Sequence, residues 1–200
     1  MAYPPPVTER ADLDIELIDR YLAGDIDAFN ELMDAHEERV FAICYRMLQN
    51  REAALDATQD TFLTVFRKAD RYKAQAAFST WLYRVAVNTC YDHLRRQKRK
   101  RADRLPETHD PVDVASGDAY EAIEVRPDIE AALADLSPEF RAAVVLVDHQ
   151  GMSLEQASDS LDVPTGTVKS RLFRARKQLA RSLGNLKPPD EHQTGDTGER

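Results

Sequence analysis

The sequence predicts an all-α protein with two small helical domains joined by an acidic, flexible linker, and the second domain should contain a helix-turn-helix. Three observations support this fold class. Apolar residues recur at the spacing of amphipathic helices through most of the 200 residues. Residues 102–126 lose this spacing and become rich in proline, glycine and acidic residues, which is typical of linkers. The 42% hydrophobic content is sufficient for a core in each domain.

The first domain is predicted to span residues 11–101, after a disordered lead at residues 1–10. Hydrophobic periodicity indicates four helices, at about residues 13–22, 27–49, 52–69 and 80–101. The first helix should end at Gly24-Asp25 and the second at Asn50, and Ser79 should cap the fourth. In the third helix, the residues expected to face the core are Leu55, Phe62, Val65, Phe66 and Ala69.

The fourth helix ends in a dense cluster of positive charge. Between Arg95 and Arg104, seven of ten residues are Lys or Arg, which predicts a steep salt dependence if they contact phosphates. Its core-facing residues should be Leu82, Val85, Ala86, Thr89, Cys90, His93 and Leu94, with Arg84, Asn88, Tyr91, Asp92, Arg95 and Arg96 toward solvent. The aromatic residues beside the charge are Tyr72, Phe78, Trp81 and Tyr83. Such rings suit stacking on single-stranded bases, although a place in the core is an equally good interpretation for Trp81.

The second domain is predicted to span residues 127–187, followed by a disordered acidic tail at residues 188–200. A short helix over residues 128–136 should be followed by another that Ser137-Pro138 caps and starts. The run Ala-Ala-Val-Val-Leu-Val in this second helix has strand character, but helices on either side and the lack of a pairing strand favour a helix. Ser153 and Gln156 then have the spacing of a capping box, and that helix should end at residues 162–164.

The last predicted helix begins near Thr165 and has two distinct faces. Its core-facing residues should be Val168, Leu172, Ala175, Leu179 and Leu183, and the opposite arc collects Gly166, Lys169, Ser170, Phe173, Arg174 and Lys177. Between Thr165 and Lys187 there are seven Lys or Arg residues and no acidic residue. An ordinary solvated face mixes both signs to gain ion pairs, whereas this one accepts self-repulsion that a polyanion would relieve. The pattern therefore predicts a DNA-recognition helix.

Charge and cysteine usage restrict the class of protein further. The net charge is −8, but thirteen acidic residues lie in residues 105–160 between two basic blocks, which suggests two separate nucleic-acid contacts. Cys44 and Cys90 give no disulfide framework and are expected in the core. No signal peptide or membrane span is apparent, so a cytoplasmic protein is expected. Histidines and carboxylates form neither a metal-ligand set nor a catalytic constellation, so we expect no metal, no cofactor and no enzymatic activity.

The order of these parts resembles a bacterial RNA polymerase sigma factor of the small extracytoplasmic-function (ECF) kind, which has only the second and fourth sigma regions. The resemblance covers about residues 29–101 and 128–183. Its most specific motifs are DATQDTFLTVFRKADRY, FSTWLYRVAVNTCYDHLRR and VPTGTVKSRLFRARKQL, in this order. Leu55 departs from the family pattern, which commonly has an acidic residue at that position.

The resemblance implies a role for each motif. The third helix, whose outer face is polar but not basic, would dock on a coiled coil of the polymerase's largest subunit through Asp56, Gln59, Asp60 and Phe62. The downstream (minus 10) element, with flipped bases of the melted non-template strand, would contact Phe78, Trp81, Asn88, Asp92, Arg95 and Arg96. The upstream (minus 35) element would be recognised as duplex by Lys169, Ser170, Phe173 and Arg174. The acidic linker would pass through the RNA-exit path of the polymerase.

The partners that the resemblance implies are core RNA polymerase and promoter DNA, and the function it implies is transcription initiation. It also implies an anti-sigma factor, which in this family can be linked to the membrane, and no small-molecule substrate. The alternative is a stand-alone helix-turn-helix regulator that binds an operator as a dimer, with residues 29–104 as a sensing or dimerising module. That alternative needs a ligand pocket or a symmetric interface, and the sequence shows neither.

Overall fold

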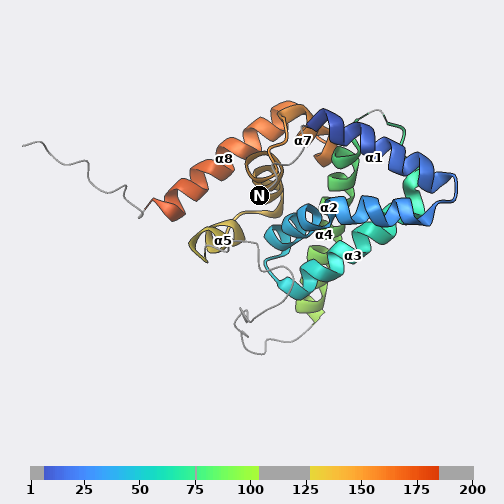
Figure 1. Ribbon diagram of the computed structural model, residues 1–200. Coiled ribbons are helices and arrows are strands. Elements are labelled where there is room, and N and C mark those ends of the chain that lie inside the picture. The colour runs from blue at the N-terminus through green and yellow to red at the C-terminus, as the bar shows by residue number, and fades with distance from the viewer. Residues whose placement is uncertain (1–6, 75, 104–126, 185–200) are drawn as a thin grey trace, which may run out of the picture.

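The computed structural model describes residues 7–74, 76–103 and 127–184, and every regular element within these ranges is helical (Figure 1). The elements are α1 (Val7–Leu22), α2 (Ile26–Leu48), α3 (Arg51–Lys68), the 3-10 turn η1 (Ala69–Arg71), α4 (Phe78–Asp103), α5 (Pro127–Ala134), α6 (Pro138–Val144), the π-helical turn η2 (Val145–His149), α7 (Leu154–Leu161) and α8 (Thr165–Leu183). The all-α prediction is confirmed. The predicted linker and the two predicted disordered ends lie outside the described residues, apart from the ends of the helices that border them.

The helix boundaries of the first domain differ from the predictions at two caps. Asn50 does not end α2; Gln49 ends it in a left-handed conformation, and the Asn50 side chain caps α3 by accepting a hydrogen bond from the Ala53 amide at 2.8 Å. Ser79 does not cap α4 either. The Ala77 carbonyl already accepts the Thr80 amide at 2.9 Å, so α4 begins at Phe78 and Ser79 lies in its first turn.

The core of the first domain forms where α2, α3 and α4 pack against one another. Its largest fully buried side chains include Phe41, Ile43, Met47, Phe78 and Leu82. Cys44 and Cys90 are also fully buried, as expected. A hydrogen bond with the Cys44 thiol, together with burial, raises the pKa of the Cys90 thiol well above its usual range. Cys90 is therefore a neutral thiol in the folded chain, and both cysteines belong to the core.

The outer face of α3 is more apolar than the sequence predicts. Phe66 was expected in the core, yet its ring is 44% exposed. It packs edge-on against Phe29, with ring centroids 5.1 Å apart, and lies 5.3 Å from Tyr21. These rings cover one side of Phe66 only, because α3 lies at the edge of the domain and has no further helix above it. The prediction of a buried Phe66 is wrong for this reason.

The second domain is built on local capping interactions that the sequence indicates directly. Ser137 caps α6, and the apolar run that follows it is helical, as preferred, with a π turn over its last residues. At α7, the Ser153 hydroxyl accepts the Gln156 amide at 3.1 Å, and the Gln156 side chain accepts the Ser153 amide at 2.9 Å. Asp162 ends α7 in a left-handed conformation, φ 54°, and α8 begins at Thr165. The capping-box prediction and the start of α8 are confirmed.

A buried arginine fixes the loop between α5 and α6 and also contacts the first domain. The Arg141 side chain is only 7% exposed, and its guanidinium donates to the backbone carbonyls of Leu133 (2.8 Å), Ala134 (2.7 Å), Leu136 (3.1 Å) and Met47 (2.6 Å). Burial lowers the pKa of Arg141, and the carboxylates of Glu130 and Asp135 oppose this effect. One side chain therefore joins the end of α2 to the second domain.

Helix α1 is attached to α2 by a buried polar pair. The Asp14 carboxylate lies 2.9 Å from His36 Nε2, and the two side chains are 4% and 1% exposed. The His36 ring also packs edge-on against Phe78, at 5.4 Å between centroids. His36 Nδ1 has no hydrogen-bond partner among the described residues, so Asp14 is the only polar group there that stabilises this imidazole.

We expect Asp14→Ala to lower the free energy of unfolding by about 1–3 kcal/mol, because it leaves the buried His36 ring without a hydrogen-bond partner. Urea denaturation followed by circular dichroism measures the loss. Asp12→Ala removes a carboxylate from the same helix at an exposed position and serves as the control. Equal urea midpoints for the two variants would contradict a structural role for the Asp14–His36 pair.

Candidate nucleic-acid interface

The exposed face of α8 carries the four residues predicted to recognise duplex DNA. Lys169, Ser170, Phe173 and Arg174 are all exposed and follow one another at helical spacing, so they form one surface. The Phe173 ring is 70% exposed, the highest exposure of any large apolar side chain in the described residues. The Ser170 hydroxyl donates to the Thr167 carbonyl at 2.9 Å, which fixes its oxygen beside the helix. An exposed mixture of cations, a hydroxyl and a ring can contact phosphates and base edges in a major groove.

The opposite face of α8 holds the helix against the domain. Val168, Leu172 and Ala175 are buried, as predicted, and the Gln178 side chain donates to the Asp135 carbonyl at 3.0 Å. Arg176 forms a two-pronged ion pair with Asp148. This hydrogen bond and the charge of Asp148 raise the pKa of Arg176.

Arg176 therefore anchors α8 rather than extending its DNA-contacting surface. In the sequence, Arg176 is not distinguishable from the other six cations of this segment. The residue that pairs with it lies 28 positions earlier in the chain, so no local pattern indicates the pair.

The basic end of α4 forms a second exposed surface. Asn88, Asp92, Arg95 and Arg96 are exposed, as are Lys98, Arg99 and Lys100 in the turns that follow. Arg95 forms an ion pair with Asp92 at 3.4 Å, but the two side chains are 71% and 56% exposed, so the pair contributes little. Solvated cations at a helix end are suited to phosphate contacts that position a strand without selecting its sequence.

Of the aromatic residues at the start of α4, Phe78 and Tyr83 are buried in the core, whereas Tyr72 and Trp81 are only partly buried. Phe78 is 1% exposed and packs against Tyr72 at 5.6 Å and Trp81 at 5.8 Å between centroids. The Phe78 ring is enclosed by its neighbours and is not accessible from the surface, so its predicted contact with DNA stays a prediction that the burial does not favour. Trp81 is partly buried, with its ring 5.7 Å from that of Tyr72, and its indole lines a cavity. Trp81 thus belongs partly to the core, and its contact with DNA stays a prediction.

Of the four residues on α3 that are predicted to contact polymerase, only some are accessible from the surface. Asp56 and Gln59 are exposed, whereas Phe62 is 6% exposed and belongs to the core, so the ring of Phe62 offers no contact surface. The Asp60 carboxylate lies 3.0 Å from Nε2 of His93 on α4, and this contact fixes the orientation of the carboxylate. Leu63, 50% exposed, and Phe66 share the face of Gln59. This apolar surface is not predicted by the hydrophobic periodicity, which assigns Phe66 to the buried stripe.

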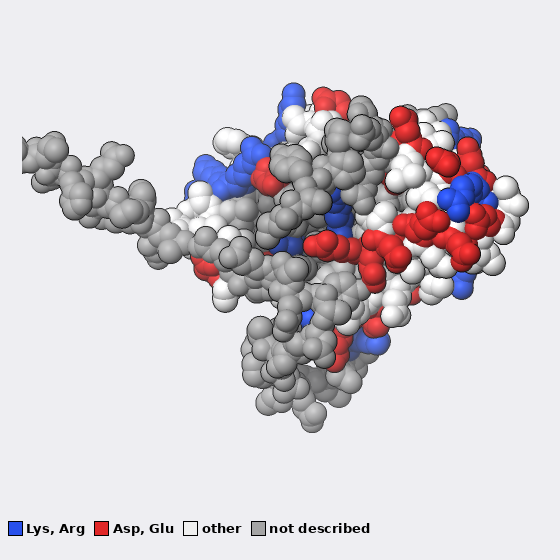
Figure 2. All heavy atoms as spheres, viewed as in Figure 1, with Lys and Arg blue, Asp and Glu red and all other residues white. Residues whose placement is uncertain are grey.

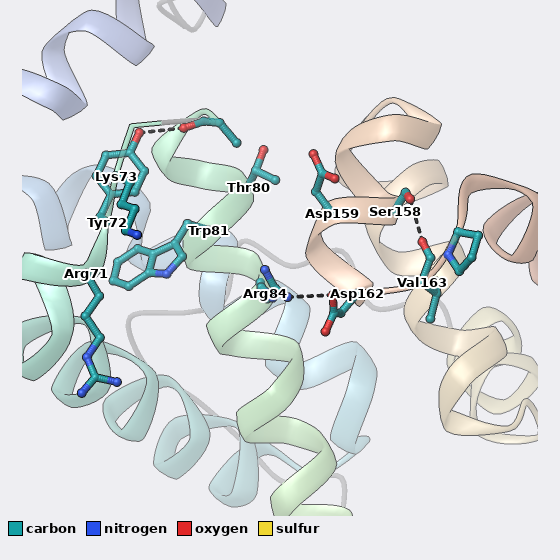
Figure 3. A pocket seen from close by; sticks show the side chains of 12 residues that line it. Arg71, Tyr72, Lys73, Thr80, Trp81, Arg84, Ser158, Asp159, Asp162 and Val163 are labelled. Carbon is teal, nitrogen blue, oxygen red and sulfur yellow. Dashed lines mark hydrogen bonds and ion pairs between the residues drawn. The ribbon is translucent and has the colours of Figure 1, made fainter.

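A cavity of about 780 Å³ lies between α4 and α7, where the two domains meet (Figure 3). The first domain lines it with the cations Arg71, Lys73 and Arg84 and with the rings of Tyr72 and Trp81, and α7 with its following turn contributes Asp159 and Asp162. Arg84 and Asp162 form an ion pair across it at 3.0 Å. The cavity therefore joins aromatic and cationic side chains of one domain to carboxylates of the other.

Charge is divided between the two sides of the molecule. Figure 2 shows Asp and Glu gathered over the side formed by α1, α2 and α3, whereas Lys and Arg follow α8 at the opposite end. Nucleic acid is therefore attracted to α8 and to the end of α4 and repelled by the acidic side. Within the described ranges, no group of His, Cys, Asp or Glu side chains is arranged to hold a metal ion. Nor is any helix in these ranges long and apolar enough to cross a membrane.

Comparison with known proteins identifies the two domains. Residues 32–100 match the Sigma-70 region 2 family, and residues 126–179 match the Sigma-70 region 4 family. The ECF RNA polymerase sigma factor SigM of Mycobacterium tuberculosis is 40% identical over 173 residues, which are 86% of each chain. The chain belongs to the ECF sigma factors. The ECF sigma factor SigW of Bacillus subtilis is 32% identical over 82% of this chain and 92% of its own.

The relatives of this ECF sigma factor differ in length and include solved structures. SigE of Mycolicibacterium smegmatis is 41% identical over 155 residues, but this chain covers only 60% of SigE. The sigma factor RpoE of Bartonella quintana, solved with the anti-sigma factor NepR, superposes with a TM-score of 0.67 at 26% identity, over 80% of this chain and 98% of that one. CnrH, solved with the cytosolic domain of CnrY, gives a TM-score of 0.65 at 22% identity over 87% and 99%, and supports the fold alone.

The two faces of α8 should respond differently to truncation. Leu172→Ala should lower the free energy of unfolding by about 2–5 kcal/mol, because the side chain is 4% exposed in the core. Phe173→Ala should change it by no more than about 0.5 kcal/mol, because the ring is in solvent. Urea denaturation of both variants measures the difference, and a large loss for Phe173→Ala would show that this ring is part of the fold.

Proposed function

We propose that this ECF sigma factor contacts core RNA polymerase through α3, the downstream promoter element through α4, and the upstream element through α8. The observation that carries the proposal is the exposed face of α8, where Lys169, Ser170, Phe173 and Arg174 lie together while the apolar face is packed. Packing of the opposite face turns this arc to solvent, but it does not require the arc to carry two cations and an exposed aromatic ring with no acidic residue. Family membership favours this function over that of a dimeric operator-binding regulator.

The contact residues follow from exposure. On α3 we propose Asp56, Gln59 and Asp60, supported by Leu63 and Phe66 on the same outer surface, because exposed apolar groups ringed by polar ones are typical of protein interfaces. On the first domain's DNA side we propose Trp81, Asn88, Asp92, Arg95 and Arg96, with Phe78 supporting Trp81 from the core. An anti-sigma factor is a further partner that we propose from the relatives solved in complex with such proteins.

The direct test is reconstituted transcription. Purified chain and core RNA polymerase are combined on a library of genomic fragments, and start sites are mapped. We expect a shared promoter motif with an upstream and a downstream element. Initiation that is identical with and without the chain would contradict the proposed function.

Gln59→Lys should weaken association with core polymerase without unfolding the chain, because Gln59 is exposed on the proposed contact surface and a cation there alters its charge. Affinity capture of core polymerase, or a fluorescence titration, measures the binding. Asn30→Lys adds the same charge at an exposed position of α2 and is the control. Equal polymerase binding by the two variants would remove this face of α3 from the interface.

Arg174→Ala should cost about 1–3 kcal/mol of promoter binding in the holoenzyme and relax the preference at one or two upstream positions, because Arg174 can reach base edges. Lys98→Ala should weaken all promoters alike and reduce the salt slope by about one unit, as expected for a phosphate contact. Promoter-library transcription at several salt concentrations separates the two effects. Arg181→Ala, two turns further along α8, controls for loss of charge, and an unchanged upstream preference in Arg174→Ala would leave Arg174 a phosphate contact only.

A further inference from the structure

The cavity between α4 and α7 has the size and the lining of a small-molecule site. Its volume of about 780 Å³ lies within the range of ~300–1,000 Å³ that is usual for ligand pockets. Three kinds of group border it, namely aromatic rings, cations and carboxylates, and they come from the loop after η1, from α4 and from α7 with its following turn. The ligand that fits best is therefore one that uses all three kinds of group.

Two aromatic rings form one wall of this cavity. The Tyr72 and Trp81 rings lie 5.7 Å apart between centroids and are tilted by 38°. The Tyr72 hydroxyl donates to the Ala76 carbonyl at 2.8 Å, which holds the ring and its loop in place (Figure 3). Phe78 supports both rings from the core, with its centroid 5.6 Å from Tyr72 and 5.8 Å from Trp81. A planar ligand can stack on a wall that is fixed in this way.

Two cations beside these rings are not balanced by acidic partners. Arg71 and Lys73 are exposed and border the cavity, and within the described ranges neither of them forms an ion pair. Arg84 differs, because Asp162 already pairs with it at 3.0 Å. The charges of Arg71 and Lys73 are therefore available to an anionic group, and phosphate is an anion that arginine and lysine commonly bind.

The other side of the cavity carries oxygen atoms that suit hydrogen-bond donors. Asp159 projects from α7 toward α4 (Figure 3), and its carboxylate has no hydrogen-bond partner in the part of the chain that the structure describes. Thr80 borders the cavity from α4, and its buried hydroxyl oxygen is likewise without a partner among the described residues. A ligand with hydroxyl or amino groups would supply donors to this side.

We propose that this cavity binds a free nucleoside phosphate, with its base against Trp81, its phosphate at Arg71 and Lys73, and its ribose hydroxyls toward Asp159. An inorganic anion would leave the aromatic wall unused, and an apolar ligand would leave the cations without a partner. A nucleotide uses the rings, the cations and the carboxylate together. This site goes beyond the proposed function, because its ligand is a free nucleotide and not a promoter strand.

The base and phosphate of this ligand also occur in a DNA strand, and the Asp159 carboxylate favours the free nucleotide of the two. A deoxyribose within a strand has no 2′-hydroxyl, and its 3′-hydroxyl is esterified to the next phosphate. Such a sugar offers Asp159 no hydrogen-bond donor and places a second negative charge near the carboxylate, which repels it. A free ribonucleotide has both hydroxyls and no second phosphate at that position.

The fluorescence of Trp81 reports on this site directly, because it is the only tryptophan of the chain. The full-length chain is titrated with AMP in the absence of polymerase, and adenosine, inorganic phosphate and a single-stranded oligothymidylate are titrated separately. Titration of N-acetyltryptophanamide with the same compounds corrects for light that they absorb. AMP should quench the fluorescence saturably. Adenosine should bind about tenfold more weakly because it lacks the phosphate, and inorganic phosphate should leave the emission unchanged.

Two variants with matched controls connect the binding to the proposed contacts. Lys73→Ala should weaken AMP binding about tenfold and Asp159→Ala about threefold, because each removes a hydrogen-bonding group. Asp159→Ala also removes a negative charge, which by itself would strengthen the binding of an anion, so weaker binding identifies a hydrogen bond. Lys68→Ala at the end of α3 and Glu155→Ala on α7 remove the same charges at exposed positions outside the cavity and should bind AMP like the parent chain. Urea denaturation establishes that each variant is folded.

The outcomes decide between a free nucleotide, a strand and no ligand. Saturable quenching by AMP that weakens in Lys73→Ala and Asp159→Ala but not in their controls supports the site. Absence of quenching by AMP would overturn the proposal, and so would equal AMP affinities for each variant and its control. Quenching by the oligothymidylate alone would assign the Trp81 ring to a strand and would also overturn it. Failure of the chain to direct initiation by core polymerase would contradict the proposed function without changing the AMP titration, so the two failures are distinguishable.

Discussion

The position of α4 is the constraint on which the rest of the structure depends. The first half of α4 packs into the core through residues spaced four apart, which lie on one face of the helix. They are Phe78, Leu82, Ala86 and Cys90, and none is more than 1% exposed. Burying each of the larger side chains stabilises the domain by about 1.5–3 kcal/mol. The orientation of α4 about its axis is thereby fixed. Once it is fixed, Arg84 faces Asp162 after α7, the Trp81 ring lies beside Tyr72, and the charged second half projects from the core into solvent.

The second domain is organised by different forces. Its turns are determined by short-range groups, the capping box at Ser153, the left-handed Asp162 and the proline before α8, which set the angle between α7 and α8. One of its attachments to the first domain is Arg141, whose guanidinium donates to four backbone carbonyls and has no carboxylate partner within hydrogen-bond distance among the described residues. Carbonyl acceptors supply hydrogen bonds but no compensating charge. Burial of this cation is therefore tolerated only because all its acceptors are held in place.

The sequence predicts those features that arise from residues within about one helical turn. Helix type, the capping box and the start of α8 follow from spacing along the chain and are confirmed, and of the predicted buried face of α8, Val168, Leu172 and Ala175 are buried whereas Leu179 and Leu183 are only partly buried. Two helix boundaries were predicted wrongly, at Asn50 and at Ser79. Polar residues of these types occur both at the ends of helices and in the adjacent turns, so spacing alone does not assign the cap. Choosing between those positions requires the backbone path, which spacing does not contain.

The features that the sequence does not predict depend on residues far apart in the chain. Periodicity identifies the apolar side of a helix but not whether another helix covers all of it, and so Phe66 was placed in the core and Tyr91 in solvent. A count of cations does not show that Arg176 pairs with Asp148 or Arg84 with Asp162. For the candidate site, residue types on α8 and at the end of α4 were therefore predictable, whereas the buried positions of Phe62 and Phe78 and the contact between domains were not.

The distribution of charge gives the two DNA-binding surfaces different availability. With a net charge of −8, the chain as a whole repels a polyanion. The repulsion is strongest at the acidic side formed by α1, α2 and α3, which lies at the opposite end of the molecule from α8. The face of α8 that carries Lys169, Ser170, Phe173 and Arg174 is exposed in the present arrangement of the two domains. The start of α4, by contrast, lies against carboxylates of α7 that already neutralise its cations. The cations at the start of α4 are therefore less available to an added polyanion than those on the exposed face of α8.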